Sequence, residues 1–255
     1  MLNGLMAVVT GGTAGIGRAC AEALLADGAR GVLINGRDAG RAERAREAIQ
    51  ARFPAARVVV AVGDVAEART AEAVMSEGMK HLGRIDVLVN STGGNDLPRL
   101  LHRTPVADIP GVLTRCLFAQ ILCCAAALPY MRQAGGGAII NIASDAGKIP
   151  TPGESVIGAA MAGIVMFTRA LAVEGKRDGI RANVLTPSIT SGTEHYDKVM
   201  ADPFAGRIFA KAEKMAALGV VSKEELAGLA VFLASPAAAK ITGQAISMTG
   251  GISAL

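Results

Sequence analysis

Short apolar runs alternate with longer amphipathic segments along the whole chain. We predict strands at the apolar runs, which are Leu5–Val9, Gly31–Asn35, Arg57–Val62, Ile85–Asn90, Ala138–Ile142, Ile180–Leu185 and Gln244–Met248. We predict helices between them, at Gly15–Asp27, Ala39–Arg52, Ala66–Leu82, Ile109–Arg132, Ser155–Asp178 and Lys223–Ala234. Strands that are apolar on both faces and separated by helices indicate a parallel sheet covered on both sides. The pattern therefore predicts an α/β fold, a doubly wound parallel sheet of about seven strands with helices on both faces.

Two stretches interrupt this alternation, and both follow a predicted strand. The first, 93–108, is rich in Pro, Gly and Arg, and the second, 187–209, carries Ser, Thr, Gly and His. Ligands of open parallel sheets bind beyond the carboxyl ends of the strands, and long loops there are often functional. Because no linker or repeat is evident, we expect one domain over residues 1–255, with a substrate-loop insertion near 188–216.

Composition narrows the function classes. The formal charge is +4, aromatic residues make up 3% of the chain, and no basic block is interleaved with aromatics, so we expect no nucleic-acid partner. The N-terminus lacks a signal-peptide pattern, and the longest apolar stretch, Leu117–Leu128, is shorter than the roughly twenty residues of a membrane span. The four cysteines have no metal-ligand spacing. We therefore expect a cytoplasmic protein with no metal site and no membrane partner.

A glycine-rich turn follows the first predicted strand. Residues 10–17 read Thr-Gly-Gly-Thr-Ala-Gly-Ile-Gly and lead into the first predicted helix. Glycines permit a tight turn and a close approach of the backbone to a pyrophosphate, and a helix N-terminus offers free N–H donors. The strand–turn–helix context favours a nucleotide site. The alternative is that the glycines serve only to pack the helix against the strand.

This turn resembles the phosphate loop of the short-chain dehydrogenase/reductase family, and further segments resemble that family's motifs in order along essentially the whole chain. Those segments are Asp64–Val65, Asn90–Gly93, Asn141–Ser144, Asn183–Ser188, Ile241–Gln244 and Gly250–Gly251. The resemblance implies a Rossmann-type domain that binds NAD or NADP and acts on a small-molecule alcohol or ketone. The cofactor-contacting positions that it implies are Gly11, Thr13, Gly15, Ile16, Gly17, Arg37, Asp64, Val65, Asn90 and Gly93.

The choice between the two dinucleotides depends on the end of the second predicted strand. A carboxylate there binds the ribose 2′-hydroxyl of NAD, whereas a basic residue suits the 2′-phosphate of NADP. The sequence has Asn35, Gly36, Arg37 and Asp38, which favours NADP. Two alternatives remain open: Arg37 is a solvated residue, and Asp38 either caps the next helix or accepts from a ribose.

The family's catalytic positions are largely replaced. Active members use Asn, Ser, Tyr and Lys, in which the tyrosine hydroxyl exchanges a proton with the substrate oxygen and the ammonium lowers its pKa. Ser144 matches the serine, but Ile157 and Met161 occupy the tyrosine and lysine positions, and Cys116 falls on the asparagine position. Loss of a general acid or base costs roughly two to four orders of magnitude in rate. We therefore predict that this chain does not perform the family's proton transfer.

We expect such a chain to act beside an active one. The predicted helices Ile109–Arg132 and Ser155–Asp178 carry more apolar surface than one sheet face can cover, and in the family these helices pack against a neighbouring subunit. The main hypothesis is a silent subunit, with weak or absent dinucleotide binding, paired with an active paralogue in a hetero-tetramer, or otherwise forming a homo-tetramer. The complex would oxidise a secondary alcohol to a ketone, with a hydroxyacyl-CoA as one substrate type.

Two alternatives stay open. One is a self-sufficient NAD(P)-dependent oxidoreductase whose proton donor is His195 or Tyr196, both in the stretch after the sixth predicted strand. The other is a dinucleotide-binding regulator without turnover. We predict that the remaining tyrosine, Tyr130, packs in the core.

Overall fold

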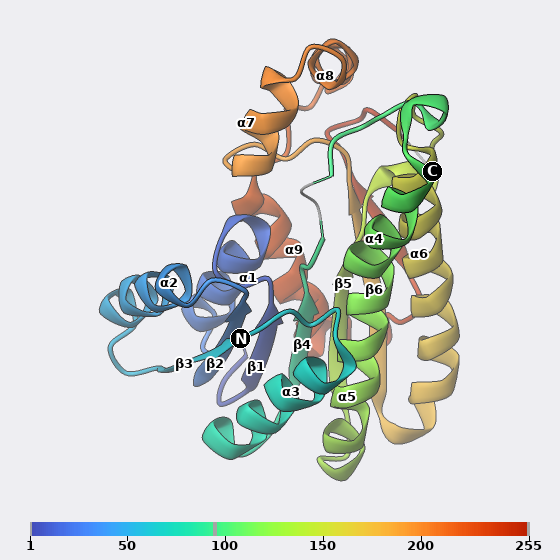
Figure 1. Cartoon of the computed structure of the whole chain (residues 1–255). Helices are drawn as coiled ribbons and strands as arrows, with labels where there is room; N and C mark the ends of the chain where they lie inside the picture. Colours follow the sequence, from blue (N-terminus) through green and yellow to red (C-terminus); the bar gives the residue numbers. More distant parts are fainter. Residues whose placement is uncertain (1, 94–95, 254–255) are drawn as a thin grey trace.

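The computed structural model, which describes residues 2–93 and 96–253, is built on a seven-stranded parallel sheet of order β3-β2-β1-β4-β5-β6-β7 (Figure 1). The strands are β1 (Met6–Thr10), β2 (Gly31–Gly36), β3 (Arg57–Val62), β4 (Val87–Asn90), β5 (Gly137–Ile142), β6 (Ile180–Pro187) and β7 (Ala245–Met248). Every neighbouring pair is parallel. The strand order reverses between β1 and β4, which opens a crevice at the carboxyl ends of these strands. The predicted doubly wound sheet is confirmed.

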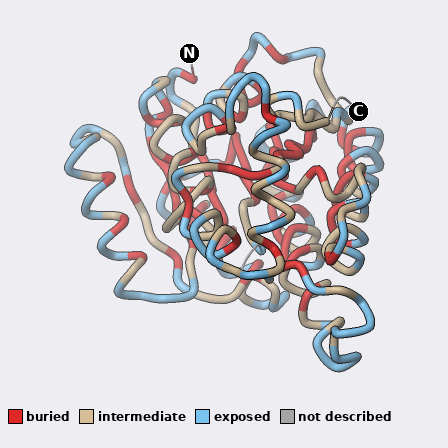
Figure 2. Tube along the Cα trace, turned by 90° about the horizontal axis from the view of Figure 1, so that it is seen from above, coloured by how far each residue is buried: buried red, intermediate tan, exposed pale blue. Residues whose placement is uncertain are grey.

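Helices cover both faces of the sheet. They are α1 (Gly15–Ala26), α2 (Ala39–Arg52), α3 (Ala68–Leu82), α4 (Ile109–Leu113), α5 (Ala119–Gln133), α6 (Ser155–Gly175), α7 (Glu194–Ala201), α8 (Ala205–Met215) and α9 (Lys223–Ala234). Alternate residues of β1 enter opposite cores: Val9 packs with α1, α2 and α9, whereas Val8 packs with α3, α5 and α6. This two-residue period explains why the strands read as apolar on both faces. Figure 2 shows buried residues concentrated in the centre of the molecule.

The predicted helix Ile109–Arg132 is continuous but changes geometry in its first half. Between α4 and α5 lies one π-helical segment, η3 (Thr114–Phe118), which contains Cys116. π-Bulges occur mostly as single turns inside α-helices and often near functional sites. The bulge brings the buried Cys116 into the crevice at the carboxyl ends of the strands.

The predicted long loop at 187–209 is wrong in part, because most of it is helical. Strand β6 continues to Pro187, and α7 and α8 follow, at the top of the molecule in Figure 1. Local polar groups start both helices: Thr193 accepts from the backbone N–H of Tyr196, and Asp202 accepts from those of Phe204 and Ala205. We call residues 194–215 the α7–α8 segment. In the other predicted loop, Gly94 and Asn95 lie outside the described residues.

Two helical stretches, Val106–Gln133 and Ser155–Asp178, are long and apolar enough to cross a membrane by length and composition alone. Core helices of globular proteins meet the same criterion. In both stretches a continuous face is buried against the sheet, with Cys123 and Ala127 on α5 and Leu171 on α6 inside one hydrophobic core. The absence of a membrane partner stays a prediction.

Candidate active site

A cleft of about 720 Å³ lies beyond the carboxyl ends of the strands and beneath the α7–α8 segment. Gly11 lines it after β1, Gly36 at the end of β2, Ser91 after β4, and Ser144 after β5. His195 and further residues of the α7–α8 segment close it from above. The cleft therefore occupies the place where an open parallel sheet binds its ligand.

The glycine turn forms one end of the cleft. Gly11 has φ +65°, and a Cβ atom there would lie 2.1 Å from the carbonyl oxygen of Ser91, so only glycine fits. Gly11, Thr13, Gly15 and Ile16 line the cleft, and α1 begins there without a side-chain cap. Its first N–H groups are thus available to a phosphate. This end of the cleft fits a dinucleotide pyrophosphate.

Gly17 has a different task from the other glycines. It is buried and lies behind the lining of the cleft, and a Cβ atom there would come 2.4 Å from the carbonyl oxygen of Gly11. The glycine at this position lets α1 pack against its own preceding turn. The alternative that the glycines serve only in packing thus holds for Gly17. Gly11, in contrast, both packs closely and faces the cleft.

The ribose end is lined by charged groups that already have partners. The side chain of Asp38 accepts from the backbone N–H of Arg41 at 2.6 Å, so Asp38 caps α2, which is one of the alternatives left open by the sequence. Arg37 is mostly exposed, and its Nη1 lies 3.8 Å from Oδ2 of Asp64. Arg41 pairs with Glu194 of α7. Arg37, Asp64 and Val65 line the cleft, and their contacts with a dinucleotide and the NADP preference stay predictions.

The side chain of Asn90 is turned into the protein interior. It accepts from Thr10 at 3.0 Å and donates to Asn141 at 2.9 Å, and Asn141 in turn donates to Thr168 of α6 at 2.8 Å. All four residues are fully buried. Asn90 therefore links β1, β4, β5 and α6, while Gly93, three residues later, lines the cleft.

The four positions that resemble the catalytic set all line the cleft. Ser144 follows β5, and its Oγ accepts from the backbone N–H of Ala146 at 3.2 Å. Ile157 and Met161 stand one turn apart on α6, and Cys116, which is 1% exposed, comes from η3. The structure thus brings a hydroxyl, two apolar side chains and a buried thiol together at this end.

Close backbone contacts determine how α6 lies against the segment after Ser144. A Cβ atom on Gly158 would be 2.8 Å from the carbonyl oxygen of Ala146, and one on Gly147 would be 2.7 Å from the carbonyl carbon of Met161. The short helix η4 (Asp145–Gly147) therefore packs directly against the first turns of α6. This packing determines which α6 side chains face the cleft.

The two side chains considered as substitute proton donors differ sharply. The hydroxyl of Tyr196 donates to Glu213 of α8, and this bond raises the pKa of Tyr196. His195 lines the cleft, burial lowers its pKa, and within the described part of the chain its Nδ1 has no hydrogen-bond partner. Tyr130 packs against the core formed by α3, α5 and α6, as predicted. Of the two side chains, His195 is therefore the one with an unpartnered polar atom in the described structure, its buried Nδ1.

Several buried polar atoms in the walls of the cleft lack partners among residues 2–93 and 96–253. They are Oγ1 of Thr92, Oδ1 of Asp145, Oγ1 of Thr190 and Nδ1 of His195. Buried polar groups are nearly always hydrogen-bonded, so these four atoms need partners that the described residues do not supply. The glycine turn and the position of the cleft at the carboxyl ends of the strands suit a dinucleotide.

Sequence reasoning missed two carboxyl groups in the cleft. Neither Asp145 nor Glu154 was among the site residues that the sequence predicted, yet both line the cleft, as Ser144 and Ile157 do. Burial raises the pKa of Glu154 to about 7, a hydrogen bond with Thr151 opposes this, and the charge of Asp145 adds to it. A carboxylate directly before an apolar helix was the available signal.

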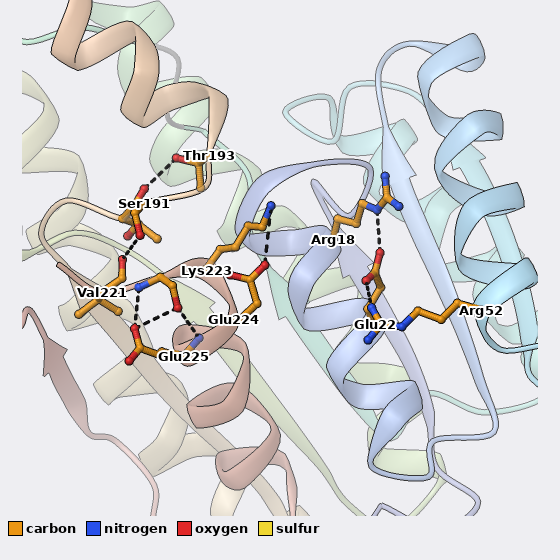
Figure 3. Close-up of polar contacts among 11 residues, drawn as sticks. Arg18, Glu22, Arg52, Ser191, Thr193, Val221, Lys223, Glu224 and Glu225 are labelled. Carbon is orange, nitrogen blue, oxygen red and sulfur yellow. Dashed lines mark hydrogen bonds and ion pairs between the residues drawn. The ribbon is translucent and has the colours of Figure 1, made fainter. Parts of the chain in front are cut away.

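The base of the α7–α8 segment is bonded to the start of α9 (Figure 3). The backbone N–H of Ser191 donates to Val221 at 2.9 Å, and the hydroxyl of Thr193 donates to Thr190 at 3.0 Å. Ser222 and Glu225 form a capping box at the N-terminus of α9. The wall of the cleft above β6 is thus anchored to a core helix.

The four cysteines are buried and form no disulfide bond. Burial raises the pKa of Cys20 and of Cys124 to about 12 in each case, so these thiols behave as small hydrophobic groups. Within residues 2–93 and 96–253, no group of three or more His, Cys, Asp or Glu side chains could hold a metal ion.

Known proteins share both the sequence pattern and this architecture. The family model for short chain dehydrogenase matches residues 5–203. The chain is 34% identical to D-beta-hydroxybutyrate dehydrogenase of Cupriavidus necator, with 98% of each chain covered. It is also 34% identical to 3-oxoacyl-[acyl-carrier-protein] reductase of a Synechocystis strain, again with 98% of each covered.

Solved structures agree. A dehydrogenase/reductase from Sinorhizobium meliloti superimposes with a TM-score of 0.88 at 30% identity, covering 99% of this chain and 96% of that one. Levodione reductase superimposes with a TM-score of 0.91 at 26% identity, covering 98% and 97%. The chain belongs to the short-chain dehydrogenase family, whose members generally bind NAD(P).

Proposed function

We propose that this chain is the non-catalytic subunit of an NAD(P)-dependent alcohol dehydrogenase of this family, paired with an active paralogue in a hetero-tetramer. The observation that carries the proposal is the pair Ile157 and Met161 in the cleft beside Ser144. Neither side chain can exchange a proton with a substrate oxygen. Neither can lower the pKa of another group that exchanges this proton.

The proposed complex converts a secondary alcohol to a ketone, with a hydroxyacyl-CoA as one substrate type. Relatives whose names state a reaction are dehydrogenases and reductases, which supports the reaction class. The four buried cysteines, which form no disulfide bond, support a cytoplasmic location.

Exposed apolar side chains support the proposed assembly. Phe118 is 49% exposed between α4 and α5, and on α6 Met166 is 62% exposed and Val173 63% exposed. Contiguous apolar surface on monomers commonly marks an interface. We expect a second family chain on these helices, either the active paralogue or, failing that, another copy of this chain in a homo-tetramer.

The test measures turnover by the purified chain alone and after mixing with the co-encoded paralogue. We expect no NAD⁺- or NADP⁺-linked oxidation of secondary alcohols by the lone chain, and turnover only in the mixture. Turnover by the lone chain would contradict catalytic silence.

Dinucleotide titration of the lone chain accompanies this assay. We expect weak or absent binding, because Ile157 and Met161 occupy the Tyr and Lys positions that contact the nicotinamide ribose in the family. Tight binding without turnover in either sample would instead favour the dinucleotide-binding regulator.

One observation favours a second function, a self-sufficient oxidoreductase. The buried Nδ1 of His195 is unpartnered in the described structure, and its lowered pKa leaves the imidazole neutral and able to accept a proton. If the lone chain does turn over, His195→Gln should lower kcat at least about a hundredfold, the scale of a lost general base. The variant Tyr196→Phe should have little effect on kcat, because the Tyr196 hydroxyl is engaged by Glu213.

A further inference from the structure

A groove of about 510 Å³ runs along α8, at the top of the molecule in Figure 1. Two rows of side chains line it. The first row is Phe204, Arg207 and Ala210, and the second is Ile208, Lys211 and Lys214. Successive residues in each row are three positions apart or nearly so, and such rows are the ridges that interlock when two helices pack. The space between them, which we call the α8 groove, therefore has the form that accepts a ridge of another helix.

The α8 groove is lined by positive charge without a counter-charge. Arg207, Lys211 and Lys214 are exposed, and none of the ion pairs in the described structure includes them. Among the described residues, no carboxylate lines the groove. Like charges one helical turn apart repel each other, so an anionic partner would both relieve this repulsion and add attraction.

Carboxylates of the α7–α8 segment are engaged elsewhere. Glu213, on α8 itself, accepts from the hydroxyl of Tyr196 on α7. Asp202 accepts from two backbone N–H groups at the start of α8, and Glu194 pairs with Arg41 of α2. These three carboxylates thus leave the cations of the α8 groove to a partner.

The spacing of the cations favours an extended partner. Seven residues separate Arg207 from Lys214, which is roughly 10 Å along the helix axis and longer than a single phosphate or carboxylate group. Carboxylates one turn apart on a second helix match this spacing. Beside the cations, the half-buried Phe204 and Ile208 lie one turn apart and offer apolar contacts to the same helix. A groove receives a rod, whereas a lipid bilayer is flat, so the shape favours a helix over a membrane surface.

We propose that the α8 groove docks an acidic amphipathic helix of another protein, whose carboxylates pair with the three cations while its apolar side chains contact Phe204 and Ile208. The proposal goes beyond the proposed function, because it concerns a face of α8 rather than of α5 and α6 and requires no turnover. Since α8 also lines the cleft, this partner would bind directly beside the cleft.

The experiment titrates the full chain with a synthetic alanine-based helical peptide and measures the heat of binding. The peptide carries glutamates at one-turn intervals on one face and leucines on the adjoining face. A scrambled peptide of the same composition and a peptide with glutamine for glutamate are the comparisons. We expect saturable binding of the acidic helix that weakens as salt is added, and binding of both comparison peptides at least about tenfold weaker.

Two matched variants each remove three positive charges. The groove variant combines Arg207→Gln, Lys211→Gln and Lys214→Gln, and the control variant combines Lys176→Gln, Arg177→Gln and Lys240→Gln. The control positions are exposed and lie shortly before β6 and β7, at the edge of the sheet opposite the cleft. We expect the groove variant to bind the acidic peptide at least about tenfold more weakly, and the control variant to stay within about twofold of the original chain.

Three outcomes overturn the proposal: no saturable binding of the acidic peptide, equal affinity for the scrambled peptide, or an equal loss of affinity in the two variants. The comparison of peptides uses the unaltered chain and decides the matter even if the groove variant fails to fold. Vesicles that contain phosphatidylglycerol are titrated in parallel. Binding to these vesicles that requires the three cations, without binding of the peptide, would assign the groove to a lipid surface and overturn the proposal.

Discussion

Individual residues in this cleft divide into those required by the fold and those available to a ligand. Gly17 and Asn90 belong to the first group, because Gly17 allows a tight backbone contact and Asn90 joins three strands and a helix. Ser144, Asp145 and Glu154 belong to the second, since all three line the cleft. Motif matching alone does not separate these groups, because it reads Gly11 and Gly17 alike.

At position 11 we expect alanine to be severely destabilising. The added Cβ would lie 2.1 Å from a backbone oxygen at a positive φ, so Gly11→Ala should lower the free energy of unfolding by several kcal/mol, on the scale of strained or overpacked sites. Thermal or urea unfolding measures this.

The control for Gly11→Ala is Gly228→Ala on α9. A Cβ there meets nothing within 4 Å, so this variant should gain up to about 1 kcal/mol in stability from helix propensity. Equal stability of the two variants would contradict the tight turn.

Glu154 should make stability depend on pH. Its pKa in the folded chain is about 7 against an ordinary value of 4.5, so the folded state binds more protons between these values and stability falls as pH rises through that window. Relative to the original chain, Glu154→Gln should therefore gain up to about 3 kcal/mol between pH 4 and pH 8. Unfolding at both pH values checks the sign, and the exposed Glu72→Gln on α3, which should show no such pH-dependent gain, is the control.

At the level of secondary structure, the sequence predicts regular elements well and irregular ones poorly. The seven predicted strands lie within a residue or two of β1–β7, because most of them are buried on both faces and read as mainly apolar runs. Helices α7 and α8 were missed because they are short and polar. They begin at side-chain hydrogen bonds of Thr193 and Asp202 rather than with an apolar period. The π-turn at Cys116 was not foreseeable from the local sequence. For Glu154, its place directly before an apolar helix was a signal, but the extent of the burial that raises its pKa was not.

The capping box of α9 should matter to both the helix and the cleft. Ser222→Ala removes the hydroxyl that accepts from Glu225, and we expect a loss of about 1 kcal/mol in stability. Because Ser222 also pairs with Ser191 at the base of the α7–α8 segment, amide hydrogen exchange in that segment should rise. Ser155→Ala, at the exposed first position of α6, is the comparison; a similar loss there would argue against a specific cap effect.

At the level of the whole molecule, some apolar side chains remain exposed. They lie on the side of the sheet that α5 and α6 cover and at scattered sites elsewhere. Met166 and Val173 project from α6 with about three fifths of their surface exposed, 62% and 63% respectively. The predicted assembly would bury them. The structure of a single chain is compatible with a partner at this face.

We expect Met166→Glu with Val173→Glu to shift the protein to a smaller mass in light scattering and to reduce co-purification with the proposed active paralogue. Burying two carboxylates at an apolar interface is strongly unfavourable. The control, Met215→Glu, alters a 57%-exposed side chain on α8 and should leave the assembly intact. An unchanged mass for the double variant would exclude this face as the interface.

The steric demand at Gly11 and Gly17 has a consequence for how silent chains are recognised. Both glycines are imposed by backbone atoms of the turn and of Ser91, whether or not a nucleotide ever binds. Descendants of an enzyme can lose nucleotide binding and still retain these glycines. A genome survey that searches for the glycine motif would therefore count active and silent chains together. The side chains at positions 157 and 161 of α6 would be needed to tell the two apart.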